Sequence, residues 1–370
     1  MRCSRWCRAT KGSSVRLDEP AWWYGSDGGL AAKCLQPLAA AWGAIATRRY
    51  KREVPYRAGL PVICIGNFTA GGTGKTPLAL CVAAELARLG RRPAFLTRGF
   101  GGRLAGPHWV DAAADSATEV GDEPLLLARA WPTLVARDRR AGARAIEAAG
   151  ARTIEAGEGA ADVIIMDDGL QNPQLAKDLV LAVVDGRRGV GNGRVMPAGP
   201  LRAPLDFQLG LTDAVVVNMP HAMSYESEMG DRLRQSFPGP VLAATVQPRE
   251  PTGWLEGKTV VAFAGIGAPQ RFFDLLGRLG ANVARSVAFA DHHVFSAADA
   301  AHLLGLAKEH EALLVSTEKD WARLDGSQAT GRLKAATRPL LVAMVFDERD
   351  RGRLVALLDM ALDTRISPAG

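Results

Sequence analysis

The segment Gly66-Asn67-Phe68-Thr69-Ala70-Gly71-Gly72-Thr73-Gly74-Lys75-Thr76 decides the fold. It lies between an apolar run at residues 60–65 and the helical pattern of residues 77–89. A strand, a glycine-rich loop and a helix in this order form the phosphate-binding loop of P-loop nucleoside triphosphatases, with the pattern G-x-x-x-x-G-K-[ST]. The end of the pattern is intact, whereas Thr69 stands where the first glycine is expected.

The composition of this loop suits a triphosphate. Gly71 and Gly72 allow backbone N–H groups to turn inward around phosphate oxygens, and the N-terminus of the following helix adds positive potential. Lys75 is expected to reach the β- and γ-phosphates, and the Thr76 hydroxyl to bind Mg²⁺. The alternative is a glycine-rich turn that contains Lys-Thr by chance, and the strand–loop–helix context argues against it. The predicted ATP-binding residues are Thr69, Ala70, Gly71, Gly72, Thr73, Gly74, Lys75 and Thr76.

A second apolar run, residues 163–166, ends in Asp167 and Asp168. Carboxylates at the end of a strand hold Mg²⁺ directly or through water in P-loop enzymes. This pattern is weak by itself, because many strands end in Asp as a turn residue. Its position roughly 90 residues after the phosphate-binding loop strengthens the prediction. Two adjacent carboxylates also favour a nearby cation, because like charges repel. Mg²⁺ is therefore the expected metal, and the sequence leaves open which Asp contacts it.

Apolar runs alternate with helical patterns from residue 60 onward, which predicts a doubly wound α/β fold with a mostly parallel sheet. Polar residues follow most of the runs, and ligands of such sheets bind outside the carboxyl ends of the strands. The expected strands are residues 60–65, 93–97, 133–136, 162–166, 179–184 and 214–217, and the expected helices include 77–89 and 138–149.

A second, smaller α/β unit is expected after residues 238–240 and 248–253, which contain the turn residues typical of a boundary. Strand 259–264 leads into a helix that begins near Pro269, and Ser296 caps a helix that ends near His310. Strands 312–315 and 340–346 are expected to complete this unit. The predicted parts of the chain are an N-terminal segment (1–57), a P-loop kinase domain (58–250) and a smaller α/β domain that completes the cleft (251–370).

The N-terminal segment carries the basic character of the chain. Residues 1–57 contain eleven Lys and Arg but four Asp and Glu, whereas the rest of the chain has 34 basic and 35 acidic residues. The neutral body argues against a nucleic-acid surface. The five cysteines form no C-x-x-C pair, which fits a reducing cytosolic compartment.

An amphipathic helix from Pro37 to about Lys51 is expected in this segment. Leu38, Trp42 and Ile45 share one face of it, and basic residues close it. Aromatic and basic residues together are typical of a helix that lies in a membrane interface, and an anionic lipid surface is the leading partner. The alternative is a helix packed on the core of the protein, and the residues alone leave both open.

Several further segments resemble the tetraacyldisaccharide 4′-kinase family, the lipid A kinases of Gram-negative bacteria. The resemblance covers roughly residues 19–345, and the family variant of the loop also has Thr in place of the first glycine. Val190 and Met196 depart from the pattern, where an aromatic residue and Leu are expected. The matching segments are Arg98–Gly102, Gly121–Pro124, Asp167–Gln171, Asp185-Gly186, Gly191–Gly193, Pro197–Arg202, Phe263–Gly267, Asp291-His292 and Ser316–Asp320.

This resemblance implies an ATP- and Mg²⁺-dependent kinase. The γ-phosphoryl group would pass to the 4′-hydroxyl of an acylated glucosamine disaccharide 1-phosphate, to give lipid IVA in lipid A biosynthesis. The resemblance also implies a peripheral enzyme on the cytoplasmic face of the inner membrane, in agreement with the basic, aromatic N-terminal segment. No obligate protein partner is evident in the sequence.

Two residues are candidates for acid–base chemistry. Asp122 precedes a predicted helix, residues 124–130, and from spacing alone the role of a helix N-cap is favoured. The resemblance implies instead that Asp122 is the catalytic base and that His292 assists it. We expect His292 to orient Asp122 across the cleft between the two α/β units; otherwise it is an exposed loop histidine.

The remaining candidates are weaker. Gln171 is a candidate for the metal shell within the Asp167–Gln171 motif, and Arg98, Arg188, Arg202 and Lys319 are candidates for contact with phosphate or substrate, or are solvated surface charges. Two other functions stay open from the residues alone. One is a P-loop kinase for a different sugar or cofactor, and the other is a nucleotide-gated switch that binds a partner.

Overall fold

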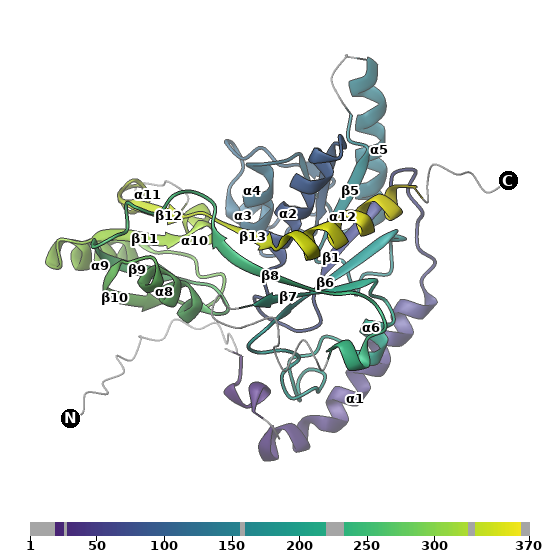
Figure 1. The fold of residues 1–370 in the computed structure, drawn as a ribbon, viewed down its shortest axis with the longest axis horizontal. Helices are drawn as coiled ribbons and strands as arrows, with labels where there is room; N and C mark the ends of the chain where they lie inside the picture. The colour runs from purple at the N-terminus through teal and green to yellow at the C-terminus, as the bar shows by residue number, and fades with distance from the viewer. Residues whose placement is uncertain (1–18, 26–27, 156–159, 220–232, 325–329, 364–370) are drawn as a thin grey trace.

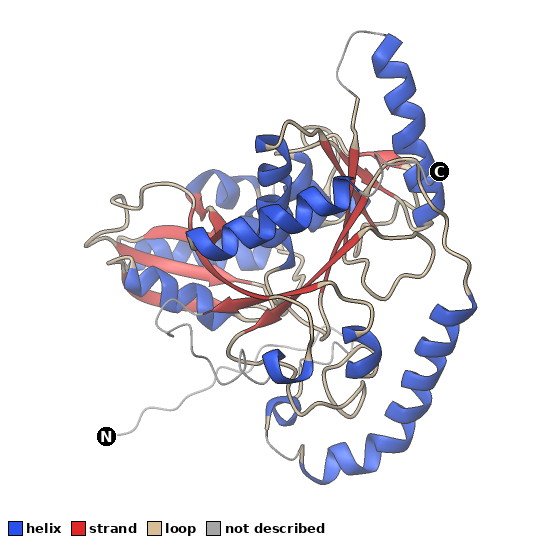
Figure 2. Ribbon diagram, turned by 45° about the vertical axis from the view of Figure 1, so that its right-hand side comes forward, coloured by secondary structure: helices blue, strands red, loops and turns tan. Residues whose placement is uncertain are grey.

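The computed structural model describes residues 19–25, 28–155, 160–219, 233–324 and 330–363 (Figure 1). Residues 1–17, for which the sequence shows no pattern, lie outside the described part. The described chain forms a large and a small sheet side by side, with helices on both faces of each (Figures 1 and 2).

The large sheet has nine strands in the order β13-β8-β7-β6-β1-β5-β2-β4-β3. Seven central strands run parallel, and β3 and β13 are antiparallel edge strands. This confirms the predicted doubly wound, mostly parallel sheet. Its strands are β1 (Val62–Gly66), β2 (Pro93–Thr97), β3 (His108–Trp109), β4 (Thr133–Val135), β5 (Val163–Asp167), β6 (Leu179–Asp185), β7 (Ala214–Met219), β8 (Val241–Pro248) and β13 (Val342–Phe346).

Helices bury both faces of the large sheet, which is why its strands are continuous apolar runs. Ile63 and Ile65 of β1 pack into a core with α2 (Lys75–Arg88) and α12 (Glu348–Asp363). Val62 and Cys64 face the opposite core, with α5 (Arg139–Glu155) and α6 (Leu205–Leu209). The short helices α3 (Ala117–Val120) and α4 (Asp122–Ala128) lie between β3 and β4 in the sequence.

The small sheet has four parallel strands in the order β10-β9-β11-β12. Ser296 caps α9 through a capping box with Asp299, as predicted. The strands are β9 (Thr259–Ala264), β10 (Asn282–Ala288), β11 (Leu313–Thr317) and β12 (Thr337–Leu340), and the helices are α8 (Pro269–Arg278), α9 (Ala297–Glu309), α10 (Glu318–Arg323) and α11 (Gly331–Ala336).

One expected strand divides between the two sheets. The run 340–346 was expected in the small unit, and this is wrong for residues 342–346, which form β13 and pair with β8 in the large sheet. The physical reason is burial, because Met344 and Phe346 pack into the large-sheet core beside Leu354 and Leu358 of α12. The predicted boundaries 58–250 and 251–370 stay a prediction, with the chain returning to the large sheet after β12.

Three strands were not expected: the two-residue edge strand β3, and β8 and β10. The turn residues of 238–240 and 248–253 predict a boundary, and β8 occupies the residues between these two segments. The edge strand β10 is largely exposed and therefore lacks the continuous apolar run by which the other strands were found.

Helix α1 (Gly29–Arg52) begins before the predicted start at Pro37, which lies inside the helix. The residues from Leu30 to Gln36 include several good helix formers, so the helical pattern continues through the proline. Helix α1 runs along the outside of the molecule (Figure 2), where Gln36 accepts a hydrogen bond from Arg194 at 2.8 Å. None of the helices in the described residues combines the length and the apolar character needed to cross a membrane. A short 3₁₀ helix, η1 (Ala21–Tyr24), precedes α1.

Candidate active site

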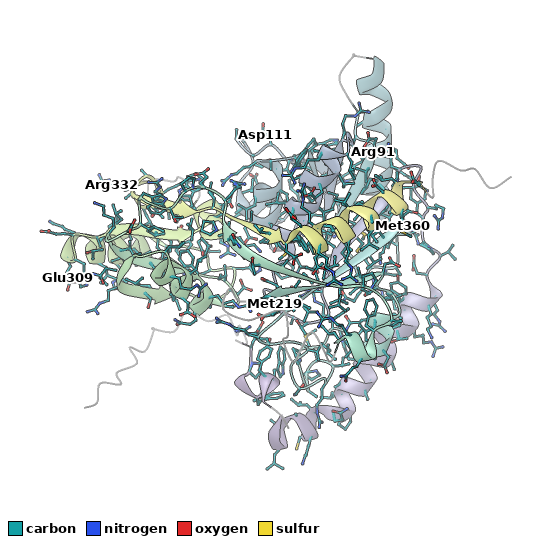
Figure 3. The ribbon with its side chains drawn as sticks, in the orientation of Figure 1. Arg91, Asp111, Met219, Glu309, Arg332 and Met360 are labelled. Carbon is teal, nitrogen blue, oxygen red and sulfur yellow. The ribbon has the colours of Figure 1, made fainter. Side chains whose placement is uncertain are left out.

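A cavity of about 1050 Å³ opens at the carboxyl ends of the central strands. Its walls include the phosphate-binding loop, His292 and Lys319 of the small-sheet unit, and Trp42 and Ile45 of α1. Met219 also lines the cavity; it is the last residue of β7 and lies near the middle of the molecule, between the sheets, in Figure 3. The polar residues that follow the strands thus converge on one site, as expected.

The phosphate-binding loop is held by buried amide side chains. Asn67 donates to the Thr69 carbonyl at 2.7 Å, and Asn218 at the end of β7 donates to the Thr73 carbonyl at 3.0 Å. Gly74 has a φ of 103°, and a Cβ there would lie 2.7 Å from Asn218. Glycine is therefore required at this position, whereas Thr69 avoids the left-handed region and accepts a side chain. This explains how the loop tolerates Thr in place of its first glycine.

Lys75 and Thr76 begin α2, at the end of the loop. Lys75 is buried, and its Nζ lies 3.7 Å from Asp168 Oδ1. The Thr76 hydroxyl lies 3.5 Å from the carboxylate of Glu123. The cation, the hydroxyl and the helix N-terminus together form a site for an anion.

The two carboxylates at the end of β5 have different environments. Asp168 accepts a hydrogen bond from Arg202 at 2.8 Å. Burial tends to raise the pKa of Asp168, but the charges of Lys75 and Arg202 hold it well below its usual range. Asp167 is also buried, and neither of its carboxylate oxygens has a hydrogen-bond partner among the described residues. Burial, with the negative charges of Glu123 and Asp168, raises the pKa of Asp167 to about 7.

The donors in this region fit Mg²⁺ bound together with phosphate. Asp167 offers two buried oxygens without partners, and Thr76 offers a hydroxyl. Within the described ranges, no group of three or more His, Cys, Asp and Glu side chains could hold a metal ion. A centre made of protein ligands alone is therefore not formed there, whereas Mg²⁺ commonly takes one or two carboxylates plus phosphate and water. Gln171 donates its amide N–H groups to Asn67 and Gln208, so only its oxygen is available to a metal.

Asp122 begins α4, one residue after the N-cap Gly121. The interpretation of Asp122 as the N-cap is therefore wrong, and its side chain points elsewhere. Its Oδ2 atom lies 3.2 Å from Nδ1 of His292 and accepts hydrogen bonds from Arg323. Burial tends to raise the pKa of Asp122, but the His292 hydrogen bond and the Arg323 charge hold it below its usual range. The hydrogen bond with Asp122 in turn raises the pKa of His292.

His292 comes from the loop after β10 and reaches Asp122 across the two units, as expected from the sequence. Its φ is 57°, which is uncommon for a residue with a side chain. The Phe100 ring lies 5.3 Å from its imidazole, centroid to centroid. The structure thus places the two candidate acid–base residues in contact.

The four weaker cationic candidates have distinct positions. Arg98 is exposed at the cavity wall, and Arg202 pairs with Asp168 at 2.8 Å. Lys319 contacts the Glu123 carboxylate across the two units. Arg188 pairs with Glu19 of the N-terminal segment at 2.8 Å.

Three residues of the site were not found from the sequence. Glu123 lies within a segment that resembles the family, and its contact with Thr76 was not foreseen. Arg323 lies one turn beyond another such segment, and Arg139 is buried beneath β5 with a contact to the Asp167 carbonyl at 3.4 Å. The two arginines gave no local signal, because their partners lie far away in the sequence.

The chain is similar to known proteins of one family. The family described as tetraacyldisaccharide-1-P 4′-kinase matches residues 31–362. The tetraacyldisaccharide 4′-kinase of Nitrobacter winogradskyi is 46% identical, over 90% of this chain and 94% of the relative. That of Methylobacterium nodulans is also 46% identical, over 94% of this chain and 99% of the relative.

A solved structure supports the fold. The LpxK protein of Aquifex aeolicus, crystallised in complex with ATP, matches with a TM-score of 0.68 and 23% identity, over 90% of this chain and all of that chain. The match over most of the chain and the relatives at 46% identity lead to one conclusion: the chain belongs to the tetraacyldisaccharide-1-P 4′-kinase family.

Proposed function

We propose that this chain transfers the γ-phosphoryl group of ATP to the 4′-hydroxyl of a tetraacylated glucosamine disaccharide 1-phosphate. The family supports the reaction class and the substrate. The observation that carries the proposal is a single cavity lined by the phosphate-binding loop, by His292 beside Asp122, and by apolar residues of α1. A polar phosphate site and an apolar wall together suit a phosphorylated, acylated acceptor.

Lys75 is assigned to the β- and γ-phosphates, where its ammonium group offsets the charge that develops during transfer. It lies at the N-terminus of α2 and is buried, so its attraction for phosphate is only weakly screened. Thr76 and Asp167 would hold Mg²⁺, with Asp168 next to them. When bound, Mg²⁺ supplies further neutralisation of the phosphate oxygens.

Asp122 is assigned to the acceptor. A sugar hydroxyl is a poor nucleophile, and a carboxylate within hydrogen-bond reach orients it and takes its proton as the new O–P bond forms. Its lowered pKa keeps Asp122 ionised at neutral pH, which is the form that accepts a proton. His292 holds the carboxylate from the small-sheet side through its Nδ1 contact at 3.2 Å.

Peripheral association with the cytoplasmic face of the inner membrane is part of the proposal. Leu38, Trp42 and Ile45 on α1 are exposed by 61%, 52% and 63%, which is unusual for large apolar side chains. The basic residues Arg48, Arg49, Lys51 and Arg52 are also exposed and follow on the same helix. This combination supports binding to an anionic lipid surface next to the cavity.

The test is a transfer assay with purified protein, Mg²⁺, ATP labelled at the γ-phosphate and the detergent-dispersed tetraacyl disaccharide 1-phosphate. We expect label in the lipid product, and a loss of about 10²–10³ in rate or more for Lys75→Ala. Transfer to unrelated sugars, with none to the lipid, would identify a different kinase. Slow hydrolysis without any acceptor would instead favour a nucleotide-gated switch.

A further inference from the structure

Arg323 is the last residue of α10 in the small-sheet unit, and its side chain is only 6% exposed. Its guanidinium donates to Asp122 Oδ2 from both Nε, at 2.8 Å, and Nη2, at 2.5 Å. Nη1 donates to the Gly265 carbonyl at 2.5 Å and to Asp320 Oδ1 at 2.8 Å. A buried arginine whose Nε, Nη1 and Nη2 atoms all donate hydrogen bonds is held in one orientation, because its guanidinium group is planar.

The surroundings of Arg323 are fixed in turn. Asp320 Oδ1 also accepts the backbone N–H of Gly265 at 2.9 Å, so Gly265, Asp320 and Arg323 form a closed ring of hydrogen bonds. Gly265 follows β9, and Asp320 and Arg323 belong to α10, so the ring is built entirely from the small-sheet unit. Asp122 belongs to α4 beside the large sheet, and it is therefore held from the other unit.

The contacts of Asp122 are unequal between its two oxygens. Arg323 and His292 both approach Oδ2. Among the described residues no hydrogen bond or ion pair reaches Oδ1, and this atom is not one of the fully buried atoms that lack a partner. Oδ1 is therefore the oxygen of Asp122 that the contacts of the described residues leave open.

We propose that Arg323 is a positioning residue, which holds the Asp122 carboxylate by Oδ2 so that Oδ1 faces the acceptor hydroxyl. This inference rests on the proposed function, and it adds the element that fixes the direction of the carboxylate. His292 alone gives one contact to Oδ2, about which the carboxylate can still rotate. Nε and Nη2 of Arg323 add two donors from a different direction to the same oxygen, so Oδ2 is held between the two residues.

The positive charge of Arg323 also lowers the pKa of Asp122. The other charged groups near Asp122 are His292 from the loop, Lys319 and Asp320 from α10, and Glu123 on its own helix, and Asp291 acts on His292. Burial raises the pKa of Asp122, and the His292 hydrogen bond and Arg323 oppose that effect. Loss of Arg323 therefore raises the pKa of Asp122, and it also raises the pKa of His292, on which Arg323 acts in the opposite sense.

The experiment compares Arg323→Met and Arg323→Lys with a matched control, Arg129→Met. Arg129 lies on the C-terminal side of α4, and its guanidinium is 4.8 Å from the ring of Trp321 on α10, so it joins the same two helices without touching Asp122. For Arg323→Met we expect kcat to fall about 10²-fold, as for a misplaced catalytic group, with the KM for ATP unchanged. Arg323→Lys is expected to have a kcat between those of Arg323→Met and the wild type, because lysine keeps the positive charge but lacks the planar guanidinium group. Arg129→Met keeps the kcat of the wild type.

Two further readouts separate positioning from simple loss of structure. The acidic limb of the kcat–pH profile moves to higher pH in Arg323→Met and not in Arg129→Met. The imidazole of His292, followed by NMR with His292→Gln for assignment, titrates at higher pH in Arg323→Met, and this measurement needs no kinase activity. A kcat for Arg323→Met within about 3-fold of the wild type, or an unchanged His292 titration, overturns the inference. Wild-type protein that transfers no phosphate overturns the proposed function instead, whatever the titration shows.

Discussion

At the scale of single residues, Asp167 has an environment that does not stabilise the folded chain. It is 1% exposed, neither oxygen has a partner among the described residues, and negative charges lie beside it. An uncompensated buried carboxylate destabilises a protein, so residues of this kind are kept for function. A bound cation is the natural compensation.

Asp167→Asn is expected to raise stability and abolish transfer. The pKa of Asp167 is about 7 in the folded state, above its ordinary value, so its contribution to stability is present below pH 4 and is lost as the pH rises through 7. In Mg²⁺-free buffer the Tm of the variant should exceed that of the wild type by about 2–6 °C at pH 8, and by less at pH 5.5.

The matched control for this prediction is Asp359→Asn, an exposed carboxylate on α12. We expect no pH-dependent difference in Tm for it. An Asp167→Asn protein less stable than the wild type at pH 8 would show that the carboxylate has a partner that compensates its charge.

His292→Ala is expected to leave ATP affinity nearly unchanged and to lower turnover about 10²-fold. The reason is that His292 contacts Asp122, the residue proposed to act on the acceptor. Calorimetric ATP binding and single-turnover kinetics measure the two effects. The neighbouring His293→Ala is the control, because His293 pairs with Asp299 and stacks on Phe289. A large loss of ATP binding in His292→Ala would contradict the assignment.

At the scale of elements, α1 is a helix with its large apolar residues outside. The residues it buries are small: Ala32, Ala39 and Gly43, where a Cβ on Gly43 would lie 3.2 Å from Pro204. The face with small side chains allows the helix to lie close to the protein. The face with the large side chains of Leu38 and Trp42 remains exposed and can bind another surface. The sequence pattern shows which apolar residues of α1 share a face, but not whether that face turns toward the protein or toward the solvent.

Replacing Leu38, Trp42 and Ile45 together with Gln should weaken binding to vesicles that contain anionic lipid. Each side chain contributes roughly 1.5–3 kcal/mol when fully buried, so a loss of about 10²-fold or more in partition coefficient is expected. Sedimentation with vesicles measures it, and 1 M salt should separately reduce the share due to the basic end of α1.

Met360→Gln is the control for this change, since Met360 is an apolar residue 65% exposed on α12, and lies away from α1 (Figure 3). Its vesicle binding should equal that of the wild type. If the triple variant binds as tightly as Met360→Gln, α1 is not the membrane-binding element.

At the scale of the whole molecule, the chain leaves the large sheet after β8, builds the small sheet and returns through β13 and α12. The two units are thus joined by two crossings, and α12 lies across one face of the large sheet (Figure 1). Asp122 and His292 meet between these units, so the site exists only when both are folded and placed together.

A fragment of residues 58–250, the boundaries predicted for the kinase domain, is therefore expected not to fold stably. It lacks Met344, Phe346, Leu354 and Leu358, all buried in the large-sheet core. Losing one such side chain costs about 2–5 kcal/mol, and a domain has a total stability of about 5–15 kcal/mol. Thermal unfolding and limited proteolysis, with residues 19–363 as the control, measure this. A cooperative transition in the fragment would show that the large sheet is independent of α12.

The sequence by itself determined the features that depend on neighbouring residues. Short segments of sequence were enough to predict four features: the phosphate-binding loop, the apolar strands, the carboxylates after β5 and the Ser296 cap. The reason is that dihedral preferences and burial on both faces of a sheet act on neighbouring residues. The resemblance to a family added the pairing of Asp122 with His292, which no local pattern contains.

Only the tertiary structure decided which sheet received residues 342–346, which face of α1 was left exposed, and that Arg323 and His292 both hold one oxygen of Asp122. These outcomes depend on contacts between residues some 100 to 200 positions apart. Their free energy comes from burial and charge in the assembled fold, so they leave no period or spacing in the sequence from which they could be predicted.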